Sequence, residues 1–215
     1  HHPKQVMELV SRGHDVSLHG WIHEKFGELT REKAEQIIYD GTAAMRAVGA
    51  NPKGFRAPGG IRGQYAEEIL IGLGYDYDSS INHSLAQEFA GEVSSSCQPR
   101  LLASGLVNIP WLWSSIDVIH YFRQPDGPGT PSQLEAKWRS RLEAAKVGGE
   151  TLTIIAHPYV SGTDDERLNA LARFLQWAKE DRNIDIMSAR EVACSLRRQG
   201  TRPEPENTAI AGDHH

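Results

Sequence analysis

The chain has 215 residues, a length that suits one domain and that buries about 70% of its unfolded surface without a disulfide or metal. Hydrophobic residues make up 39% and charged residues 24%, which excludes a collagen-like or wholly disordered chain. Lys and Arg total 23 against 28 Asp and Glu, and this net charge of −5 gives no reason to expect nucleic acid or an anionic membrane as partner.

No apolar run approaches the ~20 residues that span a bilayer, and two cysteines are too few for a disulfide scaffold. No signal peptide is visible in this chain, so the compartment stays open with the cytoplasm slightly favoured. Assembly into a homo-oligomer also stays open.

Helical and strand patterns alternate along the chain. The first half predicts a helix over 3–12, a strand over 15–18, a helix from the N-cap Thr30 to about 48, a strand at 55–56, a helix over 65–73 and a strand over 75–80. The second half predicts a long loop over 82–100, a strand over 107–113, a helix over 132–146, an apolar strand over 151–156 buried on both faces, a helix over 164–179, a strand over 184–187 and a helix from the cap Ser188 to about 198. The alternation predicts an α/β fold with a parallel sheet, open or closed into a barrel. We expect one domain over 1–199 and a flexible tail over 200–215, whose last histidines could remain from a purification tag.

His19 and His23 follow the strand over 15–18. Their spacing lets two imidazoles reach one divalent metal, and the neighbouring Glu24 is a residue type that commonly completes such a site. Two partly exposed loop histidines are an equally good interpretation of the spacing alone.

Three further residues could take part in chemistry at strand ends. Arg56 could hold a catalytic carboxylate through two parallel hydrogen bonds, although a surface arginine before a turn is the commoner case. His157, at the end of the apolar strand, could donate a proton to a leaving amine, although a lone histidine there is more often structural. Asp117 could orient either of them or simply cap a helix.

The aromatic side chains of Trp21, Trp111 and Trp113 could form walls for a sugar ring, and we expect at least one of them to pack in the core.

Taken in order, these segments resemble the polysaccharide deacetylase domain of the carbohydrate esterase family 4 type. The resemblance rests on four segments, residues 13–24, 54–60, 77–80 and 154–158. Each segment alone is weak, but four in order at suitable spacing are fairly specific, and they span about residues 3–195.

The resemblance implies a distorted (β/α)7 barrel and a divalent metal, usually zinc, held by two histidines and an aspartate. His19 and His23 match the metal histidines, Arg56 matches the arginine that holds the catalytic aspartate, and His157 matches the histidine that protonates the leaving amine. Asp117 is the candidate for the aspartate of the remaining motif. Trp21, Pro58, Gly59, Trp111 and Trp113 are the candidate substrate-binding residues.

The sequence also departs from the family pattern. Gly20 replaces the usual Ser or Thr, and Gly59 replaces a frequent aromatic, as in a subgroup that includes peptidoglycan-deacetylase-like and allantoinase-like members. No aspartate pair precedes His19, and Asp164–Asp165 lies in the wrong place. We expect a fragment whose first strand lies elsewhere, rather than an enzyme that lost its catalytic base.

The expected function is metal-dependent hydrolysis of a carbon–nitrogen bond, first of all N-deacetylation of an amino sugar or polysaccharide. Hydrolysis of a small cyclic amide or imide on the same scaffold is one alternative. An inactive carbohydrate-binding module is the other.

Overall fold

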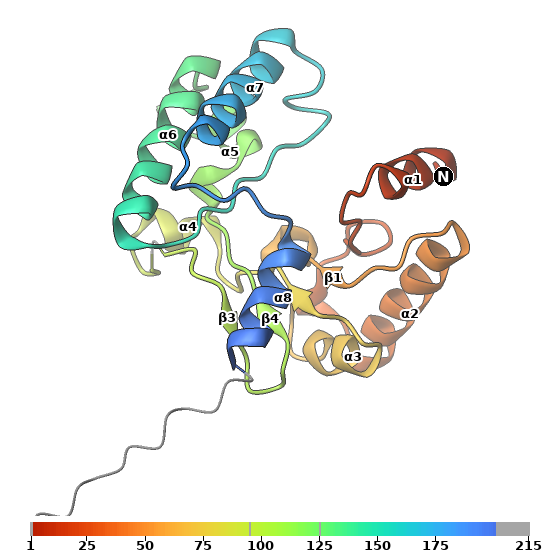
Figure 1. The fold of residues 1–215 in the computed structure, drawn as a ribbon. Coiled ribbons are helices and arrows are strands. Elements are labelled where there is room, and N and C mark those ends of the chain that lie inside the picture. Colours follow the sequence, from red (N-terminus) through yellow and green to blue (C-terminus); the bar gives the residue numbers. More distant parts are fainter. Residues whose placement is uncertain (1, 95, 125, 201–215) are drawn as a thin grey trace, which may run out of the picture.

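The computed structural model describes residues 2–94, 96–124 and 126–200 of the chain (Figure 1). Its long helices are α1 (Pro3–Ser11), α2 (Arg31–Ala47), α6 (Pro131–Gly148), α7 (Asp165–Glu180) and α8 (Ala189–Gly200). Its short helices are α3 (Ala66–Gly72), α4 (Leu85–Phe89) and α5 (Asp117–Phe122), with 3-10 turns at Phe26–Glu28, Pro58–Gly60 and Trp113–Ser115. Within these described ranges, no helix combines the length and apolar character that a membrane crossing requires.

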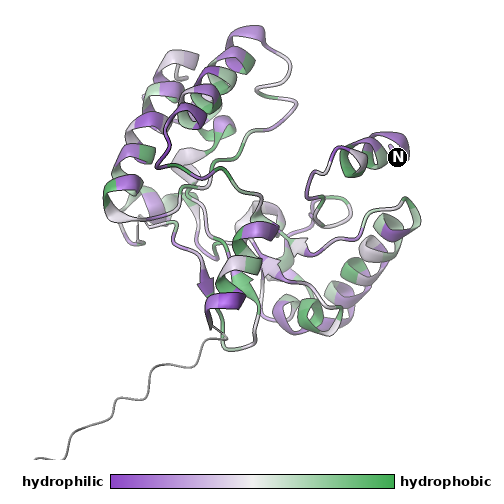
Figure 2. Cartoon of the chain, viewed as in Figure 1, coloured by the Kyte–Doolittle hydropathy of each residue, from purple (hydrophilic) through white to green (hydrophobic). Residues whose placement is uncertain are grey.

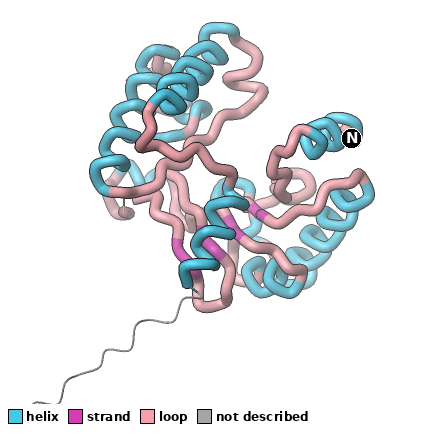
Figure 3. Tube along the Cα trace, in the orientation of Figure 1, coloured by secondary structure: helices cyan, strands magenta, loops and turns pink. Residues whose placement is uncertain are grey.

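A small, mostly parallel sheet forms the centre of the fold (Figure 3). Its strands are β1 (Gly54–Phe55), β2 (Tyr77–Asp78), β3 (Arg100–Leu101) and β4 (Val107–Asn108), in the order β1-β2-β4-β3. The pairs β1–β2 and β2–β4 are parallel, and β3 runs antiparallel to β4. A single parallel bridge from Leu18 to Phe55 adds one further segment beside β1, and a separate parallel bridge pairs Ile116 with Ile155. Because parallel strands end at the same edge, the residues that follow them are gathered together.

Helix α8 lies against the strands, α2 and α3 lie side by side, and α6 and α7 pack on each other farther from the sheet (Figure 1). Apolar and polar residues are interspersed along these helices (Figure 2). Helices α2 and α3 pack together around Ile38, Phe55 and Leu70. Helix α8 contacts β2 and β4 through Ala193, while Trp138 of α6 and Phe174 of α7 form a separate cluster with ring centroids 5.4 Å apart. The loops that follow the strands are therefore attached to a well-packed core of helices and strands.

The predicted helix starts are confirmed where a side chain caps the helix. Thr30 accepts a hydrogen bond from the amide of Lys33, and Asp164 accepts one from the amide of Arg167. Ser188 accepts one from the amide of Glu191 at the start of α8. Such caps are decided by residues three positions apart, so they can be recognised in the sequence.

Several predicted strands are wrong. Residues 184–187 form no strand, and Ile186 is 58% exposed. Residues 151–156 make only the bridge at Ile155 and are half-buried rather than buried on both faces. A strand is defined by its neighbours, and apolar composition alone does not supply them.

Two segments hold more structure than predicted. The expected loop over 82–100 contains α4 and the start of the β3–β4 hairpin, and α5 is an additional helix. The tail over 201–215 lies outside the described residues, so the prediction for it stays a prediction.

Candidate active site

The loop that follows Leu18 is held in a sharp turn by Glu24. Its carboxylate accepts hydrogen bonds from the amides of Trp21 (2.9 Å) and Ile22 (3.1 Å). Burial alone would raise the pKa of Glu24, but these amides lower it below its ordinary value. Glu24 therefore shapes the loop and is already occupied, so it does not extend toward a metal.

This turn brings His19 and His23 together. Their ring centroids lie 5.3 Å apart at an interplanar angle of 80°. Nδ1 of His19 lies 2.8 Å from the carbonyl oxygen of Arg56, and since a carbonyl only accepts, Nδ1 carries the hydrogen and Nε2 is left unprotonated. Burial is the main reason why the pKa of His19 is lowered, and the nearby positive groups of His23 and Arg56 add to it. The His19 ring is thus kept neutral, the state that can ligate a cation.

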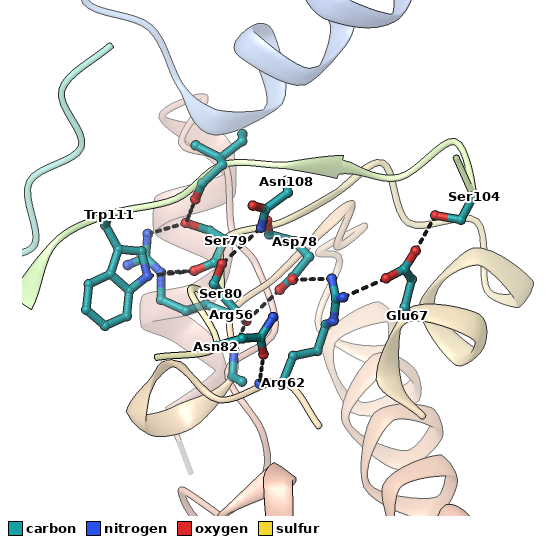
Figure 4. Close-up of polar contacts among 12 residues, drawn as sticks. Arg56, Arg62, Glu67, Asp78, Ser79, Ser80, Asn82, Ser104, Asn108 and Trp111 are labelled. Atoms are coloured by element: carbon teal, nitrogen blue, oxygen red, sulfur yellow. Dashed lines mark hydrogen bonds and ion pairs between the residues drawn. The ribbon is translucent and has the colours of Figure 1, made fainter. Parts of the chain in front are cut away.

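The arginine after β1 is fixed by the end of β2. Nε of Arg56 donates to the carbonyl oxygen of Ser79 (3.2 Å), and Nη2 donates to Oγ of Ser79 (2.8 Å). Nε1 of Trp111 donates to the same carbonyl (2.7 Å), which places the indole beside the guanidinium (Figure 4). Among the described residues, no carboxylate is hydrogen-bonded to Arg56.

A buried polar chain supports the turn that follows Arg56 (Figure 4). The amide of Ala57 donates to Oγ of Ser80 (2.9 Å), and Ser80 donates to Oδ1 of Asp78 (2.6 Å). Oδ2 of Asp78 accepts from Nη1 of Arg62 (2.9 Å), and Arg62 is also paired with Glu67. Burial raises the pKa of Asp78, whereas Ser80 and Arg62 act in the opposite direction. Buried hydrogen bonds, which are shielded from solvent, thereby connect the turn to β2.

His157 and Asp117 form a second pair of hydrogen-bonded side chains in the candidate site. Nδ1 of His157 donates to Oδ1 of Asp117 at 2.6 Å, and the backbone amide of His157 donates to Oδ2 at 2.7 Å. The Asp117 carboxylate is fully buried and also accepts from the amide of Val118 and from Oγ of Ser161, each at 2.7 Å. With Nδ1 engaged, Nε2 is the nitrogen of His157 that stays free for chemistry.

One cavity of about 670 Å³ joins these groups. Its lining includes His19, His23, Arg56 and His157, so the two histidine motifs face the same space. Of the two partners that the sequence left open for Asp117, the structure joins it to His157.

The candidate substrate-binding residues fall into two groups. Trp111, Trp113 and Gly59 line the cavity, but Trp111 is also buried in the core, with its ring 5.0 Å from that of Trp113. Trp21 is 59% exposed and Pro58 is buried, and neither is among the residues that line the cavity.

Sequence reasoning missed the serines that hold the site. Ser79 and Ser80 lie in a segment whose resemblance had been noted, but hydroxyls carry no spacing signal that would reveal their partners. Ser161 was missed for the same reason. Tyr159, two residues after His157, also lines the cavity, and its position directly after the histidine–proline pair was the available signal.

Comparison with known proteins finds similarity to polysaccharide deacetylases and peptidoglycan deacetylases. Residues 1–77 match the family model described as polysaccharide deacetylase. A peptidoglycan deacetylase of Helicobacter pylori is 28% identical over 82 residues, which are 38% of this chain and 28% of that protein. A peptidoglycan deacetylase-like protein of Gibberella zeae is 24% identical over 209 residues, 83% of this chain and 61% of that protein. The chain thus spans less than two thirds of either curated relative.

Solved structures share the fold over nearly the whole chain. A protein of Mycobacterium smegmatis described as a polysaccharide deacetylase has a TM-score of 0.80 and 26% identity, covering 95% of this chain and 72% of that one. The Puue allantoinase has a TM-score of 0.75 at 18% identity, covering 95% and 65%. The predicted resemblance and the predicted fold class, the distorted (β/α)7 barrel of polysaccharide deacetylases, are therefore confirmed. Polysaccharide deacetylases are enzymes, and the family matched here is one that acts on carbohydrate.

Proposed function

We propose that the protein hydrolyses a carbon–nitrogen bond, removing the acetyl group from an N-acetylated amino sugar or polysaccharide. The observation that carries this proposal is the shared cavity, which is lined by His19, His23 and by His157 with Asp117 hydrogen-bonded behind it. The similarity to peptidoglycan deacetylases supports a sugar amide as the substrate.

In this proposal His157 protonates the leaving nitrogen. Asp117 fixes the tautomer and orientation of the ring, so the proton to be transferred sits on Nε2 of the imidazolium. The amide C–N bond breaks, the hydroxyl of water adds to the acyl carbon to give acetate, and the proton that this water loses passes to the solvent. His157 supplies a proton to the amine and regains one from the solvent before the next turnover. The Asp117 carboxylate, which accepts four hydrogen bonds, stabilises the imidazolium through its hydrogen bond to Nδ1.

His19 and His23 are proposed to hold a divalent cation, with zinc as the first choice. A separation of 5.3 Å between ring centroids allows one nitrogen of each ring to lie about 2.0–2.1 Å from a shared ion. Such an ion would polarise the acyl oxygen and lower the pKa of water. No group of three His, Cys, Asp or Glu side chains suited to a metal occurs within residues 2–94, 96–124 and 126–200, so the third ligand is left unassigned.

Arg56 lies beside the histidine pair, where its charge can stabilise a developing oxyanion or hold a carboxylate. Burial lowers the pKa of Arg56, and an arginine guanidinium remains charged in proteins. Ser79 holds this charge in place.

The test is acetate release from an N-acetylated chitooligosaccharide, measured together with zinc content by elemental analysis. We expect release in the presence of zinc and about one zinc per chain. His19→Ala should lower both, whereas His83→Ala, a histidine outside the cavity, should change neither. Ring opening of a cyclic amide without acetate release would favour the alternative hydrolase, and carbohydrate binding without either reaction would favour the inactive module.

A further inference from the structure

The cavity lining holds more cationic than anionic side chains, although the chain as a whole is acidic. Two arginines, Arg56 and Arg123, and a single carboxylate, Asp15, line it together with four histidines, namely His14, His19, His23 and His157. The complete chain carries a net charge of −5. The Asp15 carboxylate is itself engaged by the hydroxyl of Tyr77 (2.7 Å) and the amide of Arg190 (3.0 Å). The lining therefore presents a field that favours an anion.

Arg123 is the cation in this lining whose charge has no assigned use. It follows directly after α5, and its amide donates to the carbonyl oxygen of Ile119 (3.0 Å), which fixes its backbone. Across the described part of the chain, no hydrogen bond or ion pair joins its guanidinium to another residue. An arginine that lines a cavity with its fork of donors unused is suited to bind a carboxylate or phosphate.

Tyr159 supplies an aromatic surface on the same cavity. Its ring is 69% exposed and lies 5.2 Å from the ring of His157. The turn that carries it is rigid, because the amides of Val160 and Ser161 both donate to the carbonyl oxygen of His157 at 2.9 Å. Val160 and Ser161 are buried, and they anchor a turn that leaves the ring of Tyr159 exposed. An exposed, fixed aromatic ring next to a catalytic histidine is a surface on which the apolar face of a sugar can stack.

We infer that Arg123 and Tyr159 form a subsite for a sugar that carries a carboxylate. This inference rests on the proposed function and narrows its substrate class to amino sugars with an acidic substituent. Helix α5 links the two residues to the chemistry, since it begins at Asp117, which holds His157, and ends just before Arg123. Tyr159 would stack on the ring while Arg123 pairs with the carboxylate.

The test compares N-acetylmuramic acid with N-acetylglucosamine, two sugars that differ by a lactyl ether bearing a carboxylate. In an NMR titration of the whole chain, the acidic sugar should bind about fivefold or more tightly than the neutral one. This ratio of affinities should decrease with added salt. Arg123→Gln should remove the preference and leave the affinity for the neutral sugar unchanged. Tyr159→Leu should weaken both sugars, and Arg182→Gln, an exposed arginine away from the cavity, should behave like the unchanged protein.

Equal affinity for the two sugars, or a preference that survives Arg123→Gln, would overturn the inference. Acetate release is measured in parallel, which separates this inference from the proposed function. A carboxylate preference without acetate release would contradict only the proposed deacetylation. Acetate release without any preference would contradict only the subsite.

Discussion

The imidazole of His157 is bonded to the fully buried carboxylate of Asp117, although forty positions separate them in the chain. Ile116 directly precedes Asp117, Ile155 lies two positions before His157, and an isolated parallel bridge joins the two isoleucines. This bridge brings the buried carboxylate next to the histidine, and the hydrogen bond to Nδ1 leaves Nε2 as the ring nitrogen available for proton transfer.

Replacing Asp117 by Asn tests this relationship. The carboxylate accepts from four donors, so an amide would direct its NH2 group toward two of them in either orientation. We expect a loss of about 2 kcal/mol in the free energy of unfolding and a loss of about 100-fold or more in kcat. Urea unfolding and acetate release measure the two effects. Asp40→Asn, at an exposed position of α2, is the control, and equal behaviour of the two variants would contradict the role given to Asp117.

Glu88 predicts a pH dependence of stability. Burial would raise its pKa, but hydrogen bonds from Ser114, the amide of Trp113 and His83 lower it below the ordinary value. A carboxyl with a depressed folded pKa contributes stability above its unfolded pKa and loses it as pH falls through the folded one. Glu88→Gln should therefore be less stable by about 1–3 kcal/mol at pH 7. The difference should shrink below about pH 4.5, the ordinary value for Glu, and a difference that stays constant down to pH 3 would refute the assignment.

Gly60 and Gly59 form a matched pair in the turn after Arg56. Both have positive φ angles, +78° and +66°. A Cβ on Gly60 would lie 2.9 Å from Ile81 and from Trp111, whereas one on Gly59 would meet no atom within 4 Å. Gly59→Ala should cost about 1–2 kcal/mol through its backbone alone. Gly60→Ala should cost about 1–3 kcal/mol more from overpacking, and denaturant unfolding that shows the two equal would mean that the turn can shift freely.

The parts of the fold that could be predicted are the local ones. Caps such as Thr30 and Asp164 act within one helical turn, so composition and spacing reveal them. The strands over 151–156 and 184–187 were overpredicted, because pairing depends on neighbours that distant sequence supplies. The capping box of Ser84 and Gln87 was a local signal for α4 that the irregular composition of 82–100 obscured.

In the candidate site too, contacts between residues near each other in the chain could be predicted, whereas contacts between distant segments could not. His19 and His23 are close in the chain, and their spacing indicates a shared ligand. The contact of His157 with Asp117, and the support of Arg56 by Ser79, depend on the order of strands and could not be read from spacing. The resemblance supplied the residues, and the fold supplied their partners.

In the proposed mechanism His157 donates the proton to the leaving amine in a hydrolytic site shared with His19 and His23. This role is tested by the kcat for acetate release from an N-acetylated chitooligosaccharide, measured for the zinc-loaded protein and for His157→Ala. We expect kcat to fall by about 10²- to 10⁴-fold with unchanged zinc content and no more than a small change in KM. Acetate release by His157→Ala at an undiminished rate would refute proton donation by this residue.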